Sequence, residues 1–208
     1  MSDSTTAASP ATDSALFDAF WSLVAEQGWQ HMSMQALASR SGMTLAELRA
    51  RVPYKAALPN LFARSVDEAV LRDNPAGGGG SARDRLFDVL MRRIDALQPH
   101  RDGIVRLGRD MRTDPVLTLM LAPQLAASMS WMLEAADIDA SGFRGMLRVQ
   151  GLCGVWIATL RAWEQDDGQD LGATMAALDR ALDRAGQIAG TLRLDLPEER
   201  PMDASTLD

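Results

Sequence analysis

Apolar residues recur three and four positions apart along most of the chain, and Gly and Pro divide this pattern into segments. Ala, Leu, Arg and Met are abundant, whereas β-branched residues are few, which favours helices over strands. We therefore predict an all-α protein.

The first third of the chain has the helix ends and the turn that are typical of a helix-turn-helix. Gly28 follows a helical pattern and is expected to end the first helix in the left-handed conformation. A short second helix from Met34 reaches Gly42, which supplies a tight turn. Thr44 and Glu47 then have the spacing of a capping box, which predicts the start of a third helix.

The remaining apolar pattern predicts a series of longer helices. A fourth helix is expected over about 58–72, and the Gly-rich stretch 73–81 predicts a flexible break. An amphipathic helix before Pro99 places Arg85, Arg92, Arg93 and Asp95 away from its apolar face. Further helices are expected over about 100–111, over an apolar pair divided at Pro123, and over about 142–163 and 170–192.

The uncharged run from Val116 to Leu133 approaches the length of a membrane-spanning helix. Asp114 and Glu134 bound it closely, and Pro123 is expected to break it into two pieces. We interpret the run as a pair of buried helices and expect no membrane insertion.

Composition and charge indicate the cellular compartment and the class of binding partner. The chain has a formal net charge of -7 and one cysteine, Cys153, so it forms no internal disulfide, which fits a reducing compartment. The N-terminal residues show no secretory signal, and we expect a cytoplasmic protein. Residues 33–55 nevertheless gather four cations against Glu47 alone: Arg40, Arg49, Arg51 and Lys55. Such a patch fits a DNA-binding face, or arginines that are simply solvated.

The sequence has few residue patterns that are typical of a catalytic or metal site. His31 and His100 are far apart and lack metal-ligand spacing, and Cys153 lies among apolar residues that raise a thiol pKa. No Gly-rich phosphate loop follows a strand. We therefore expect no enzyme activity, no metal and no cofactor.

The segments 25–29, 34–48 and 53–58 together resemble the N-terminal DNA-binding domain of the tetracycline-repressor (TetR/AcrR) family. The chain departs from that family at Leu45, Ala46 and Glu47, where the family usually has a small or basic residue, Gly and Thr. Arg49 and Val52 stand where it has an aromatic pair.

The resemblance implies a ligand-responsive transcriptional regulator that binds operator DNA as a homodimer. The implied DNA-binding residues are Ser33, Thr44, Leu45, Glu47, Arg49, Arg51, Tyr54 and Lys55. The last two helices would form the dimer interface, with Val149, Leu152, Leu178 and Leu182 as candidates. An apolar ligand or lipid would be enclosed by methionines and tryptophans: Met111, Met120, Met129, Trp131, Met132, Met146 and Trp156. Met and Trp residues at helical spacing are more often part of an ordinary core, and core packing is the favoured interpretation of this set.

This reading predicts five segments. They are a disordered N-terminus (1–12), a helix-turn-helix domain with its connecting helix (13–73), a flexible linker (74–81), a helical ligand-binding and dimerisation domain (82–193) and a disordered acidic tail (194–208).

Residues 84–88 and 92–101 also resemble the lipid-binding family of coenzyme Q biosynthesis, which shares the TetR fold but has lost DNA recognition. That resemblance implies, as an alternative, a lipid- or isoprenoid-binding accessory protein of ubiquinone biosynthesis. The acidic, Pro-containing C-terminus departs from the amphipathic helix with which members of that family end.

Overall fold

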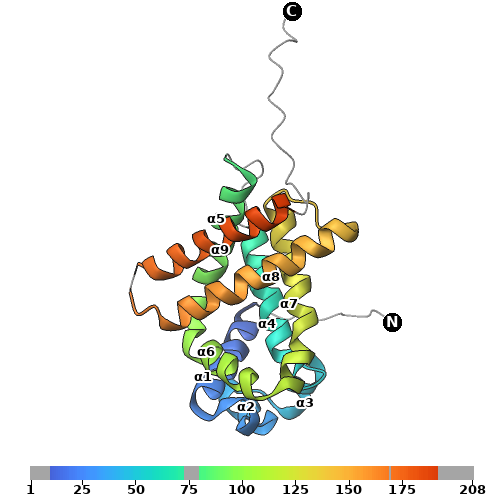
Figure 1. Ribbon diagram of the computed structural model, residues 1–208. Coiled ribbons are helices and arrows are strands. Elements are labelled where there is room, and N and C mark those ends of the chain that lie inside the picture. The colour runs from blue at the N-terminus through green and yellow to red at the C-terminus, as the bar shows by residue number, and fades with distance from the viewer. Residues whose placement is uncertain (1–9, 73–79, 169, 192–208) are drawn as a thin grey trace, which may run out of the picture. The chain divides into compact units, whose positions relative to one another are not determined.

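The computed structural model describes residues 10–72, 80–168 and 170–191. These residues are helical and contain no strand, which confirms the all-α prediction (Figure 1). The helices, in chain order, are α1 (Pro10–His31), α2 (Met34–Ser41), α3 (Leu45–Arg51), α4 (Ala57–Arg72), α5 (Ala82–Leu97), the 3-10 turn η1 (Gln98–His100), α6 (Arg101–Thr113), α7 (Pro115–Ala135), α8 (Gly142–Gln165) and α9 (Gly172–Thr191).

The chain folds into two compact units, each made from two stretches of sequence. Residues up to 66 join residues 95–124 in the first unit, and residues 67–94 join those from 125 onward in the second. Residues 95–124 belong with the first unit because α6 packs tightly on α1: a Cβ on Gly103 would lie 2.4 Å from the Trp21 carbonyl oxygen. The predicted boundary at 74–81 and the predicted N-terminal tail 1–12 lie largely outside the described residues, although α1 begins at Pro10. The predicted tail 194–208 lies wholly outside them.

The α1 helix kinks at Gly28, where φ is 76° and ψ is 166°. The prediction of a break at Gly28 is confirmed, but the left-handed helical conformation is wrong, because this ψ lies far outside that region. Contact with α6 accounts for the difference. The Trp29 amide donates to Asp110 Oδ2 at 2.6 Å, and a Cβ on Gly28 would lie 2.7 Å from Arg106 Nη2.

The predicted break at Pro123 is also wrong, because α7 is one continuous helix. Pro123 lacks the amide that would pair with the Leu119 carbonyl. Both residues are exposed, so water can take that carbonyl and the helix continues.

The α7 helix is not the buried pair that the sequence predicted. It is long and apolar enough to cross a membrane by length and composition, and 28% of its most apolar window is buried. Some core helices of soluble proteins have the same length and composition, so this observation leaves the prediction of no membrane insertion untested.

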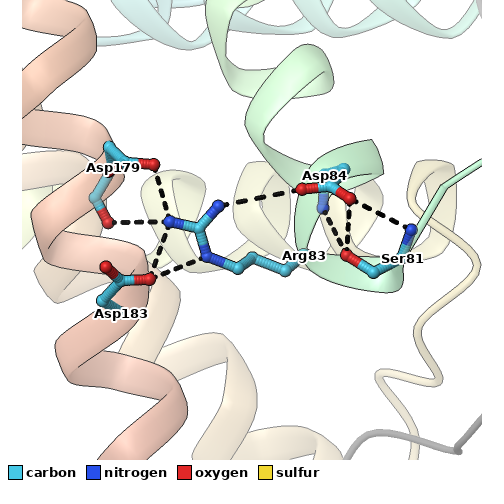
Figure 2. Close-up of polar contacts among 5 residues, drawn as sticks. All are labelled: Ser81, Arg83, Asp84, Asp179 and Asp183. Atoms are coloured by element: carbon cyan, nitrogen blue, oxygen red, sulfur yellow. Dashed lines mark hydrogen bonds and ion pairs between the residues drawn. The ribbon is translucent and has the colours of Figure 1, made fainter.

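The second unit contains α8 and α9, which lie side by side and antiparallel (Figure 1). The start of α5 is joined to α9 by Arg83, which pairs with Asp179 at 2.6 Å and with Asp183 at 2.7 Å (Figure 2). Beside it, Ser81 and Asp84 exchange hydrogen bonds across the first turn of α5. The described end of the predicted linker is therefore an ordered helix cap.

Candidate nucleic-acid interface

The α2 helix and its turn are fixed by local hydrogen bonds. Ser33 is the N-cap residue, and its hydroxyl accepts from the Ala36 amide at 3.1 Å. Gly42 ends the helix with φ 69° and ψ 18°, a left-handed conformation that glycine adopts without strain. The predicted helix-turn-helix punctuation is confirmed at Gly42.

The capping box predicted for α3 is also confirmed. The Thr44 hydroxyl accepts from the Glu47 amide at 3.2 Å, and Glu47 Oε2 accepts from the Thr44 amide at 2.7 Å. The amide and hydroxyl of Thr44 hold the pKa of the Glu47 carboxyl below its usual value. Glu47 therefore carries its negative charge at neutral pH, at the start of α3.

Several of the predicted DNA-binding side chains share the exposed surface around α3. Leu45 is 47% exposed and Tyr54 is 58% exposed, and Ser33, Thr44, Glu47 and Arg49 are exposed as well. Leu48, on the opposite side of α3, is buried in the first unit. The helix thus presents its first turn and Arg49 to solvent.

Two of the predicted cations are held against α1 instead. Lys55 donates from Nζ to the Trp29 carbonyl and lies 4.6 Å from the centroid of the Trp29 ring. Burial lowers the pKa of Lys55 below its usual value. Arg51 is half-buried, with Nη1 3.7 Å from Asp13. The α1 residues that they contact lie far away in the sequence, so the spacing of nearby residues could not predict these contacts.

A third cation of the predicted basic patch is also paired. Arg40 contacts both carboxylate oxygens of Glu26 at 2.9 Å. Because Glu26 and Asp13 come from α1, they offset part of the charge that the sequence assigned to residues 33–55. The local positive field is weaker than the count of arginines suggests.

The predicted ligand-site residues do not form one buried set. Met129, Met132 and Trp156 are buried in the second unit, and Trp131 and Met146 are exposed there. Met111 is half-buried and Met120 exposed in the first unit. Only the first three are placed to line an interior site.

The predicted dimer residues Val149, Leu152, Leu178 and Leu182 are all buried within a single chain. These four side chains therefore expose little surface to a partner subunit in this structure. The exposed apolar residues of α8 are Phe143, Met146 and Ile157, whose spacing puts them along one face.

Two features of the structure were not predicted from the sequence. Arg93, which the pattern placed away from the apolar face, is buried and pairs with Asp67. Its position seven residues after Leu86 is the signal that places both on one face. The other feature is a cleft of about 460 Å³ in the first unit, lined by α1 residues including Asp18 and Trp21 and by residues 98–103.

Groups that support catalysis are sparse in the described ranges. Burial raises the pKa of the half-buried Cys153 thiol, which opposes thiolate formation. Within residues 10–72, 80–168 and 170–191, no cluster of three or more His, Cys, Asp or Glu side chains could hold a metal ion.

No protein-family model and no curated protein matches the chain. Solved structures do match it. A TetR transcriptional regulator from Nitrosomonas europaea ATCC 19718 is 20% identical with a TM-score of 0.65, over 85% of this chain and 99% of that one. A TetR transcriptional regulator from Rhodococcus sp. RHA1 is 20% identical with a TM-score of 0.56, over 84% and 94% of the two chains. A TetR-family regulator from Streptomyces coelicolor is 16% identical with a TM-score of 0.55, over 89% and 83%. The chain therefore has the fold of TetR-family transcriptional regulators.

Proposed function

We infer that the protein is a ligand-responsive transcriptional regulator that binds double-stranded DNA as a homodimer. The observation that carries this proposal is the pair α2 and α3, capped at both starts and joined at Gly42, with the first turn of α3 exposed. A helix held in this way can enter the major groove with its N-terminal residues toward the base edges. We expect such a protein in the cytoplasm.

The DNA-facing residues of this proposal are those exposed around α3. Leu45 would meet base edges or thymine methyl groups, and Arg49 and Tyr54 would meet phosphates. Ser33 and Thr44 are exposed at the starts of α2 and α3, where their hydroxyl groups cap these helices. Lys55 and Arg51 act indirectly, because they hold the helix-turn-helix against α1.

The proposed dimer uses the exposed apolar face of α8, with Phe143, Met146 and Ile157. Gly154 lies on the same face, and a Cβ there would meet nothing within 4 Å. A helix face that carries large apolar side chains and a small residue favours close approach of a second helix.

Selection of bound fragments from genomic DNA with the full chain tests the DNA-binding proposal. Wild-type protein should enrich a specific site, and Leu45→Glu should abolish the enrichment, because it adds a second negative charge to the face that meets phosphates. Leu119→Glu is the matched control, since Leu119 is an exposed leucine on α7. Failure of the wild-type protein to enrich any site would contradict the proposal.

A further inference from the structure

Three polar side chains meet in the interior of the second unit. Asp67 from α4, Arg93 from α5 and Ser128 from α7 are 5%, 4% and 1% exposed. Arg93 Nη1 and the Ser128 hydroxyl both donate to Asp67 Oδ1, the latter at 2.6 Å. Each of these groups loses its hydration on folding, and only the contacts within the cluster offset this desolvation cost.

One nitrogen of the Arg93 guanidinium group lacks a hydrogen-bond acceptor. Its carbon Cζ lies 5.2 Å from the centroid of the Trp156 ring, on α8. Nε is buried and has no hydrogen-bond partner. Burial lowers the pKa of Arg93 to about 10, so the group stays charged at neutral pH. A charged donor in an apolar interior, next to an aromatic face, lacks one acceptor.

We propose that Arg93 is the polar anchor of a ligand site in the second unit, and that its ligand is an uncharged, largely apolar molecule with a carbonyl-type oxygen. The proposal rests on the ligand response inferred above and names the chemistry of that ligand. A carbonyl oxygen satisfies the Nε hydrogen without adding charge, and its apolar remainder suits the surrounding side chains.

Charge balance decides between a neutral and an anionic ligand. Asp67 already neutralises Arg93, so a carboxylate ligand would leave a net negative charge in the interior. A neutral acceptor leaves the pair intact. The cluster therefore selects against acids of the same shape.

The neighbouring residues are suited to admit such a molecule. Met132 lies one turn after Ser128 on α7 and shares its face, and both Met132 and Met129 are fully buried. Methionine has three rotatable bonds and adapts its shape to a guest. Thr159 on α8 is buried too, but its hydroxyl already donates to the Val155 carbonyl at 2.9 Å and offers no free donor.

Three small probes with a common phenyl ring test the proposal: acetophenone, benzoate and ethylbenzene. We expect the full chain to bind acetophenone at least about tenfold more tightly than either other probe, as measured by calorimetry, because only the ketone satisfies Nε without adding charge. The double variant Asp67→Asn/Arg93→Met removes both charges together, which buried ion pairs tolerate. In that variant the preference for the ketone over the hydrocarbon should disappear, whereas Arg92→Met, on the adjacent position of α5, should retain it.

Equal or tighter binding of benzoate, no binding of acetophenone, or an unchanged preference in the double variant would each overturn the proposal. Circular dichroism of the double variant establishes that it is folded, and if it is not, Arg93→Lys takes its place, because it keeps the charge and removes Nε. DNA selection separates this inference from the proposed function. Specific DNA binding without ketone binding overturns the inference alone, and ketone binding without specific DNA binding overturns the regulator alone.

Discussion

Replacement of Lys55 by methionine separates a structural role for this side chain from contact with DNA. Methionine keeps most of the aliphatic length and removes the ammonium group, which donates to the Trp29 carbonyl and lies 4.6 Å from the Trp29 ring centroid. A hydrogen bond from a charged donor contributes about 1.5–3 kcal/mol, and an exposed cation–π contact about 0.5–1 kcal/mol. Lys55 is only half-buried, so solvent screens both contacts. We expect Lys55→Met to lower the free energy of unfolding by about 1–2 kcal/mol.

Urea unfolding and DNA titration on the same preparations measure the two roles. For Lys55→Met we expect lower stability and an unchanged dependence of log affinity on log salt concentration, because no phosphate contact is removed. Arg49→Met is the matched control. It removes an exposed cation on α3, so it should leave stability unchanged and flatten the salt slope by about one unit for each bound helix-turn-helix. Unchanged stability with a flatter slope in Lys55→Met would refute the reasoning.

Three further predictions concern other parts of the chain. Glu47→Gln should preserve the capping box and strengthen DNA binding, whereas Glu47→Ala should lower the free energy of unfolding; equal stabilities of the two variants in urea would contradict this. Burial lowers the pKa of His100 below its ordinary 6.5, against the opposing effect of Asp18. The folded state therefore favours the neutral imidazole, and the stability that His100 contributes above pH 6.5 should be lost as pH falls. In urea titrations His100→Gln should flatten this loss of stability, and the exposed control His31→Gln should not. Leu178→Asp should prevent folding because Leu178 is fully buried. Ile157→Glu should fold but sediment as a monomer, because Ile157 is exposed on the proposed interface. A dimer of Ile157→Glu would exclude this face of α8 as the dimer interface.

Features set by neighbours in the sequence could be predicted from it. The cap at Thr44 and the turn at Gly42 each depend on residues within five positions, and both are present. The ends of α8 and α9 fall within two residues of the predicted positions for the same reason. The repeat of apolar residues was sufficient to establish the all-α fold.

Features set by contacts between distant segments could not be predicted. Lys55 meets a carbonyl 26 positions earlier in the chain, and Arg93 meets a carboxylate the same distance away. The φ and ψ of Gly28 depend on α6. Continuity of α7 through Pro123 depends on which side of the helix faces water, which a run of uncharged residues does not encode.

The binding of wild-type protein to its selected DNA site at two salt concentrations tests the central claim most directly. Fluorescence anisotropy with the selected fragment and a scrambled fragment of equal length supplies the affinities. We predict tighter binding to the selected fragment at both concentrations, and a steep loss of affinity on both fragments as salt rises, because the exposed face around α3 displaces counterions from phosphates. Equal binding to both fragments, or binding that salt leaves unchanged, would contradict the account and favour the lipid-binding alternative.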